Sequence, residues 1–300
     1  MGGQGSDRFV LALDLGSGSV KSALVSHRGE LAGTGLETVH TVFLPNGGAE
    51  QNPGQWWSAA MGAARSALAA AAVPPEQVSA VACTTAWSIT VPVDAGGQAL
   101  SNALTWMDTR GAPYNRTVVA GWPQVAGYAA PKLWKWLKLT GIVPQHSGID
   151  GLGHILYFKH ERPDVYARTH KFLEPMDYLN LRLTGKFAAS YSTIFPYALT
   201  DNRNPNRIDY HPDLLRLSGV DCAKMPDLQP VNRVFGTLKP EVAAELGLVP
   251  GTQVVTGCGD SHAATIGAAM SRGKICRVAS LMPCGLRVSS LTTRHSWSSI

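Results

Sequence analysis

Two aspartates, each beside a glycine-containing turn, are the residues of this chain best suited to do chemistry. Asp14 ends an alternating apolar segment and precedes the turn Gly-Ser-Gly-Ser at residues 16–19, with Lys21 just beyond it. Backbone N–H groups and hydroxyls in such a turn can cradle an anion. Asp260 follows Gly-Cys-Gly at residues 257–259 and opens a run of small residues, where a carboxylate suits the start of a helix. Together the two aspartates predict phosphoryl transfer.

The elements on either side of the turn at residues 16–19 indicate which kind of phosphate site it could form. A Walker loop or a dinucleotide-binding turn leads into a helix, whereas residues 20–25 (Val-Lys-Ser-Ala-Leu-Val) continue as a strand. The turn therefore closes a β-hairpin. Plain alternatives stay open, because a Gly-Ser hairpin is also an ordinary turn and Asp260 alone is also an ordinary helix cap.

Five segments form an ordered set of motifs along the chain. They comprise residues 14–21, 50–57, 106–110 (Trp-Met-Asp-Thr-Arg), 172–185 (Phe-Leu-Glu-Pro-Met-Asp-Tyr-Leu, then Arg-Leu-Thr-Gly) and 257–260. The set resembles the motifs of the FGGY carbohydrate kinases, which belong to the actin-like ATPase superfamily. The resemblance covers roughly residues 8 to 268, and its specificity lies in the order of the motifs rather than in any single one.

The resemblance implies an α/β chain with the actin-like ATPase (ribonuclease H-like) fold. It implies a complete N-terminal sugar-binding domain at residues 8–250 and the beginning of a C-terminal nucleotide-binding domain at 251–270. The implied activity is ATP-dependent phosphorylation of a sugar, a ketose such as xylulose or a polyol, with ATP and Mg²⁺ as cofactors. The partner is then a small sugar, and a homodimer is compatible with the resemblance.

Roles for individual residues follow from the resemblance. A sugar hydroxyl is a weak nucleophile, so a carboxylate must orient it and accept its proton, and Asp260 is the candidate base. Asp14 is the candidate Mg²⁺ residue, acting directly or through water, since Mg²⁺ prefers oxygen ligands and keeps several waters. The candidate phosphate contacts are Gly16, Ser17, Ser19 and Lys21, each of which is alternatively only a turn residue.

The predicted sugar pocket departs from better-known members of the family. Trp87 and Ser88 stand where xylulokinases carry Met-His and glycerol kinases carry Arg-Glu. An indole face and a hydroxyl would still suit a sugar, although Trp87 is alternatively a core residue. Trp106 and Asp108 are further candidates, and Asp108 alternatively forms a structural ion pair with Arg110. The resemblance therefore leaves the identity of the sugar open.

Residues 271–300 depart from the family pattern. They lack the Gly-Thr-Ser turn that the family places after its catalytic segment, and the chain stops where relatives continue with a second domain. We expect an aberrant, disordered tail from a truncated or frame-shifted product, with little kinase activity; a naturally short tail is the alternative. The alternative function is accordingly a catalytically inactive sugar-binding fragment. A third possibility, another actin-like ATPase of the chaperone or filament kind, is disfavoured by the Trp-rich segments.

Charge and cysteine usage exclude several classes of protein. The net charge is +5, but residues 271–300 hold five of the 26 basic residues and none of the 21 acidic ones, so no domain-wide basic surface for nucleic acid is expected. No apolar run reaches about 18 residues, which predicts no membrane span. Five scattered cysteines predict neither a disulfide framework nor a metal site, and favour a reducing, cytoplasmic compartment.

Hydrophobic periodicity and turn residues predict the main elements. A long helix should begin at Pro53 after an Asn52 cap and end before Pro74. The expected strands cover 9–15, 20–26, 31–38, 78–84, 88–93 and 253–256, and the expected further helices cover 131–139, 152–161, 175–183, 211–218 and 239–246, with surface connections at 196–212.

Overall fold

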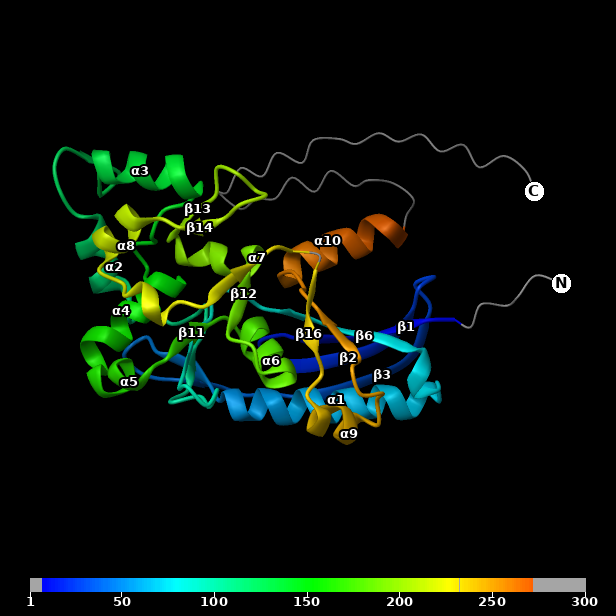
Figure 1. Ribbon diagram of the computed structural model, residues 1–300. Helices are drawn as coiled ribbons and strands as arrows, with labels where there is room; N and C mark the ends of the chain where they lie inside the picture. Colours follow the sequence, from blue (N-terminus) through cyan, green and yellow to red (C-terminus); the bar gives the residue numbers. More distant parts are fainter. Residues whose placement is uncertain (1–6, 232, 272–300) are drawn as a thin grey trace, which may run out of the picture.

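A six-stranded sheet forms the centre of the computed structural model, which describes residues 7–231 and 233–271 (Figure 1). Its strand order is β16-β17-β6-β1-β2-β3, with β6 parallel to both β1 and β17 and the remaining neighbours antiparallel. The strands are β1 (Phe9–Leu15), β2 (Ser19–Ser26), β3 (Leu31–Thr38), β6 (Val78–Thr85), β16 (Val234–Thr237) and β17 (Gln253–Val255).

The alternation of buried and half-buried residues along β1 shows which face of the sheet is packed against the core. Leu11, Leu13 and Leu15 of β1 are buried, while the residues between them are only half-buried. These leucines belong to one core cluster with the apolar side of α1 (Pro53–Ala71). In Figure 1, α1 lies under one face of the sheet and α10 (Asp260–Ser271) lies on the other. The α1 face is therefore the core face of the sheet.

The predicted long helix α1 is confirmed at both ends. The Asn52 side chain accepts a hydrogen bond from the Gly54 N–H at 2.8 Å, and Pro53 occupies the first turn, where its missing N–H costs nothing. The helix ends at Ala72, which is left-handed with φ 48°. Between these ends, alanines let α1 approach the sheet closely, and Ala60, Ala63 and Ala64 are fully buried.

A second core cluster fills the lobe drawn on the left of Figure 1, around the buried Trp136. The helices there and beside the sheet are α2 (Ala112–Val119), α3 (Ala130–Thr140), α4 (Gly151–Glu161), α5 (Pro163–Arg168), α6 (Pro175–Thr184), α7 (Tyr191–Ile194), α8 (Pro212–Ser218) and α9 (Pro240–Leu246), with 3-10 turns η1 (Pro75–Gln77), η2 (Phe195–Tyr197) and η3 (Cys222–Lys224). Short strands complete the chain: β4 (Thr41–Phe43), β5 (Ala49–Gln51), β7 (Val91–Val93), β8 (Ala103–Leu104), β9 (Gln124–Val125), β10 (Tyr128–Ala129), β11 (Lys171–Leu173), β12 (Ala188–Ser190), β13 (Thr200–Asp201), β14 (Asp209–Tyr210) and β15 (Asp227–Gln229).

One prediction about an element needs correction. The strand expected at 88–93 begins only at Val91, because Ser88 takes a left-handed conformation with φ 62° that breaks the extended run. The domain boundary expected at residue 250 stays a prediction. β17, which follows that position, pairs with β6 in the central sheet. Apart from Ser271, the tail expected to be disordered lies outside the described residues.

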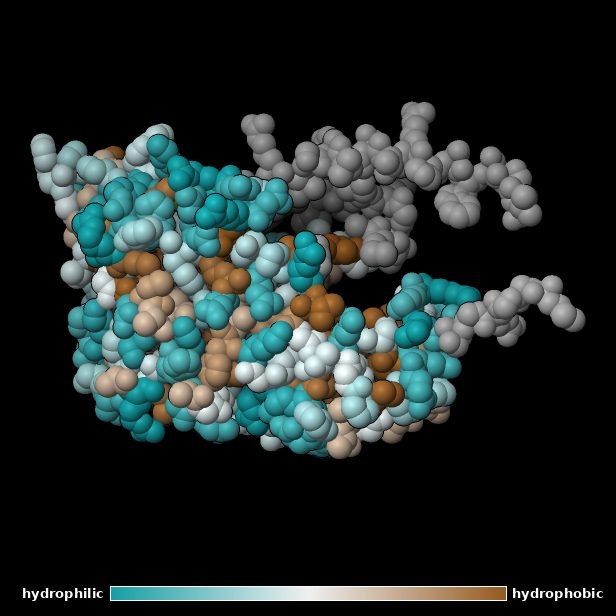
Figure 2. All heavy atoms as spheres, in the orientation of Figure 1, coloured by the Kyte–Doolittle hydropathy of each residue, from teal (hydrophilic) through white to brown (hydrophobic). Residues whose placement is uncertain are grey.

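None of the helices formed by the described residues is long and apolar enough to cross a membrane. Figure 2 shows hydrophobic atoms on the surface where Figure 1 places α10, and Ile266 of that helix is 56% exposed. The α10 face of the sheet is therefore much more open than the α1 face.

The close packing of β3 against α1 gives a stability prediction. A Cβ added at Gly35 would lie 2.1 Å from the backbone oxygen of Ala63, so Gly35→Ala must push the helix away from the sheet. We expect a loss of about 1–3 kcal/mol, as for other overpacked cores, in the free energy of unfolding measured with urea.

Gly267→Ala is the matched control, because a Cβ there meets no atom within 4 Å and alanine favours the helix. Its stability should equal or slightly exceed that of the parent. An equal loss in both variants would contradict a steric cause.

Candidate active site

The carboxyl ends of β1, β6 and β17 meet at one edge of the sheet, because these three neighbouring strands are parallel. Asp14 lies next to the last residue of β1, and Asp260 follows β17 after a short turn. The Thr84 hydroxyl near the end of β6 donates to the Cys258 carbonyl at 2.7 Å and ties the turn to the sheet. The fold thus brings together the two aspartates that the sequence singles out, 246 positions apart by number.

Asp14 carries a partly exposed carboxylate between two charged groups. It faces Lys21 across the β1–β2 hairpin, and the distance from Lys21 Nζ to Asp14 Oδ2 is 3.9 Å. The pKa of Asp14 is raised above its ordinary value, chiefly by burial; Lys21 lowers it, and the negative charge of Asp260 raises it further. The two carboxylates are therefore close enough to repel each other.

The turn at residues 16–19 closes the β1–β2 hairpin, as predicted. The Gly16 N–H donates to the Ser19 carbonyl at 2.9 Å, and the Ser17 carbonyl accepts from Gln51 Nε2 at 2.7 Å. By contrast, the N–H groups of Ser17 and Gly18 donate to no acceptor among the described residues. The turn therefore keeps two main-chain donors without an acceptor among the described residues, as an anion cradle requires.

Asp260 begins α10, and Trp87 lies against the turn before it. Asp260 Oδ1 accepts a hydrogen bond from the Ser261 N–H at 2.6 Å. A Cβ built at Gly259 would lie 3.8 Å from Trp87 Cδ1, so the indole borders the turn that carries Asp260. The side chain of Trp87 is only half-buried. Trp87 therefore lines the site edge and is not enclosed in the core.

The other predicted sugar contacts lie in three different settings. Ser88 is 9% exposed, and its hydroxyl donates to the Ile149 carbonyl at 2.8 Å. Trp106 is 44% exposed, and its indole N–H donates to Ser17 Oγ at 3.1 Å, which places it against the 16–19 turn. Asp108 is fully buried.

Asp108, predicted as a sugar contact, lies in a buried ion-pair network. Arg110 Nη2 lies 2.6 Å from Asp108 Oδ2 and 2.6 Å from Glu50 Oε1, and the Ala49 N–H donates to Asp108 Oδ2 at 3.0 Å. This is the structural ion pair that the sequence left open as the alternative. A sugar hydroxyl has no access to the Asp108 carboxylate.

Sequence reasoning missed a buried polar cluster behind Trp87. Burial raises the pKa of Glu174 well above its usual range and raises that of Asp177 to about 8, while it lowers the pKa of His154 to about 4. The Tyr197 hydroxyl is buried beside the same groups. Both carboxyl groups lie within the quoted 172–185 motif, but only the fold shows that they are fully buried.

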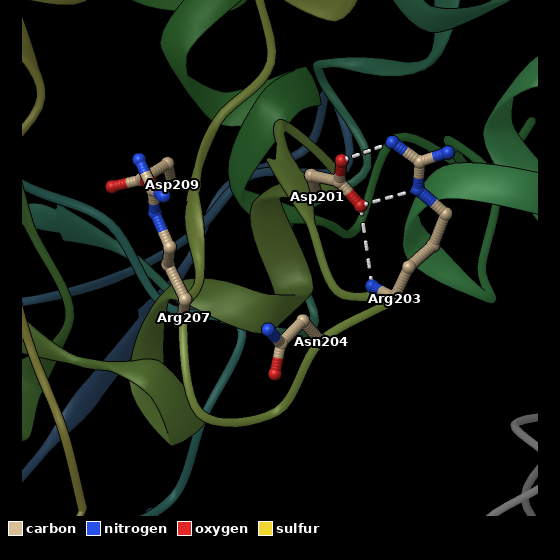
Figure 3. A pocket seen from close by; sticks show the side chains of 5 residues that line it. All are labelled: Asp201, Arg203, Asn204, Arg207 and Asp209. Carbon is tan, nitrogen blue, oxygen red and sulfur yellow. Dashed lines mark hydrogen bonds and ion pairs between the residues drawn. The ribbon is translucent and has the colours of Figure 1, made fainter.

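A charged hollow of about 490 Å³ lies around β13 and β14 and contains none of the predicted site residues. Its charges are already paired: Arg203 contacts Asp201 through two nitrogens at 2.8 and 2.6 Å (Figure 3), and Arg207 Nε contacts Asp209 at 3.2 Å. We therefore assign the candidate site to the sheet edge and not to this hollow.

A comparison with protein families identifies the family of this chain. The model of the N-terminal domain of the FGGY family of carbohydrate kinases matches residues 9–267. The chain belongs to this family. The matched range includes β17 and the start of α10, which again places residues 251–267 with the N-terminal domain model.

Two curated relatives and one solved structure illustrate the similarity. Xylulose kinase of Bacillus subtilis is 26% identical over 268 residues, covering 89% of this chain and 51% of the relative. Gluconokinase of B. subtilis is 23% identical, covering 89% and 49%. The structure of xylulose kinase from Rhodospirillum rubrum has a TM-score of 0.75 at 22% identity, covering 86% of this chain and 50% of that one. The chain thus spans about half the length of these relatives and shares their fold.

The buried ion pair gives a testable prediction. Arg110→Ala would leave Asp108 charged and buried without its partner, and we expect a loss of about 3–5 kcal/mol in the free energy of unfolding. Urea denaturation measures it. The control is Arg65→Ala, which breaks an ion pair whose side chains are 51% and 46% exposed and should cost less than about 1 kcal/mol. Weakened sugar binding at unchanged stability would instead restore a substrate role for this pair.

Proposed function

We propose that this chain forms the sugar-binding half of an ATP-dependent carbohydrate kinase, with its active site at the carboxyl ends of β1, β6 and β17. The observation that carries the proposal is the convergence of Asp14, Asp260 and Trp87 at that edge, with Asp260 close enough to perturb the Asp14 carboxyl. Family membership supports the reaction class.

Asp260 is the proposed general base. Its carboxylate is partly exposed at the start of α10, and only one of its oxygens accepts a hydrogen bond among the described residues. The other oxygen is free to orient a sugar hydroxyl and accept its proton as the oxygen attacks phosphorus. Proton transfer of this kind contributes about 10²–10⁴ to a rate.

The hairpin at the end of β1 fits the phosphates of ATP and a Mg²⁺ ion. Asp14 offers a partly exposed carboxylate, and Mg²⁺ sites in such enzymes need only one or two carboxylates beside phosphate oxygens and water. The free N–H groups of the 16–19 turn and the exposed ammonium of Lys21 suit phosphate oxygens, with Ser17 and Ser19 offering hydroxyls. When bound, Mg²⁺ would neutralise charge on the transferred phosphoryl group.

Trp87 is the proposed platform for the sugar, since carbohydrate C–H faces pack on an indole. Ser88 would contribute its hydroxyl as an acceptor, because its proton is already donated to Ile149. Trp106 lies beside the phosphate turn and would border the end of the sugar that receives the phosphoryl group. A ketose such as xylulose is the first choice, with gluconate and polyols next, in line with the names of the relatives.

A substrate panel tests the proposal. Xylulose, gluconate, glycerol and ribitol are each titrated into the protein by calorimetry and assayed in parallel for sugar-dependent release of ADP from ATP. We expect at least one member to bind, with little ADP release from this chain alone, because it spans about half the length of its relatives. Binding without ADP release even from a version that also carries the second domain would favour a non-catalytic sugar-binding protein, and no binding by any member would contradict the proposed site.

Asp260→Asn separates chemistry from binding. In a version that also carries the second domain, phosphorylation of the sugar that the panel identifies should fall by about 10²–10⁴, because the amide cannot accept the proton, while the sugar dissociation constant changes little. ADP release and calorimetry on the same preparation give both quantities. Turnover within about tenfold of the parent would remove Asp260 from the role of base.

A further inference from the structure

The segment at residues 86–90 carries Trp87 and has few main-chain anchors. At one end, the Ala86 N–H donates to the Leu15 carbonyl at 2.9 Å. At the other end, Thr90 and Leu104 exchange two backbone hydrogen bonds of 2.9 and 3.1 Å. Trp87 lies between these anchors, so its position depends on what holds the residues next to it.

Ser88, directly after Trp87, is in a costly conformation. Its φ of 62° lies in the left-handed region, which non-glycine residues adopt only when their surroundings impose it. The Ser88 hydroxyl donates to the Ile149 carbonyl at 2.8 Å, and the next N–H, that of Ile89, donates to Glu174 Oε2 at 3.2 Å. These two hydrogen bonds tie the left-handed turn to Ile149 and Glu174.

Glu174 is an unusual acceptor for such a bond. It is 1% exposed, its Oε1 has no hydrogen-bond partner among the described residues, and burial raises its pKa well above the usual range. A buried carboxyl group is expensive to keep, and an apolar side chain at this position would pack without that penalty. The free-energy cost of burying Glu174 is explained if residues 86–90 need its carboxyl group as a hydrogen-bond acceptor.

The start of α6, next to Glu174, also contacts the segment that carries Asp260. Glu174 directly precedes α6, and Met176 lies in its first turn. A Cβ built at Gly257 would lie 2.8 Å from Met176 Sδ, so this end of the helix packs against the turn between β17 and α10. The start of α6 therefore touches both segments that border the site.

We propose that Glu174 is a positioning residue: through the Ile89 N–H it fixes the left-handed turn at Ser88 and so holds Trp87 against the Gly259–Asp260 turn. Glu174 itself makes no contact with substrate. The part of this inference that concerns sugar affinity rests on the proposed function; the part that concerns the conformation of residues 86–90 does not.

Hydrogen–deuterium exchange of the peptide containing residues 86–90, with and without the sugar found by the panel, tests the proposal. Glu174→Leu fills the space but cannot accept the bond, and Glu174→Ala is the smaller form of the same change. We expect exchange at Ile89 to speed up at least about tenfold and the sugar dissociation constant to rise about five- to tenfold, the factor that one lost hydrogen bond corresponds to. KM should rise with little change in kcat.

Two further variants distinguish positioning from a general loss of stability. Glu174→Gln keeps an uncharged acceptor of the same shape and should restore both exchange and affinity. Asp177→Ala removes a second buried carboxyl from α6, whose hydrogen-bond partner is Thr193 and not the 86–90 segment; it should lower stability and leave Ile89 exchange near that of the parent.

Unchanged exchange at Ile89 in the Leu and Ala variants would overturn the proposal, whatever happens to sugar binding. Equal effects of Asp177→Ala and Glu174→Ala on this peptide would also overturn it. If exchange responds as expected but the parent binds no sugar, the positioning role stands and the proposed function fails.

Discussion

A single close approach between two strands sets the geometry of the site. A Cβ built at Gly257 would lie 1.7 Å from the backbone oxygen of Cys83, so only glycine lets the chain leaving β17 pass against β6 at this point. The turn that follows is fixed to β6 by the hydroxyl of Thr84. This contact brings Asp260 to the sheet edge where β1 delivers Asp14, and everything proposed for the site depends on it.

Buried polar groups make the rest of the site rigid at a cost in stability. Arg110 joins Asp108 to Glu50 behind the 16–19 hairpin, while Glu174 holds the turn that carries Trp87. His154 links these regions, with Nδ1 3.2 Å from the Thr90 hydroxyl and Nε2 3.4 Å from the Asp108 carbonyl. The exposed residues of the site are thus packed on a network of buried polar groups. Removing one partner from this network would lower the stability of the protein.

Local sequence signals predicted the strands of the central sheet except β16, and also α1 and the β1–β2 hairpin, because periodicity, the Asn52-Pro53 start and the Gly-Ser turn act over a few residues. The pairing of Asp108 with nearby Arg110 was open as an alternative from the sequence, but its bond with Ala49 and the role of Glu174 could not be predicted, since Ala49 and Ile89 lie far along the chain. The pairing of β17 with β6 is likewise a long-range contact that local signals do not show, since it spans more than 170 positions. The proposed roles of Asp14, Asp260 and Trp87 remain predictions from the motifs.

Sugar binding at Trp87 is the most direct test of the account. The dissociation constants of the panel sugar and of ATP should be measured by calorimetry for the parent, Trp87→Ala and Trp134→Ala, the last being a tryptophan of α3 that is 69% exposed and not at the sheet edge. Loss of the indole face should weaken sugar binding about tenfold and leave ATP affinity unchanged, while Trp134→Ala should behave like the parent. An unchanged sugar affinity in Trp87→Ala would contradict the site proposed here.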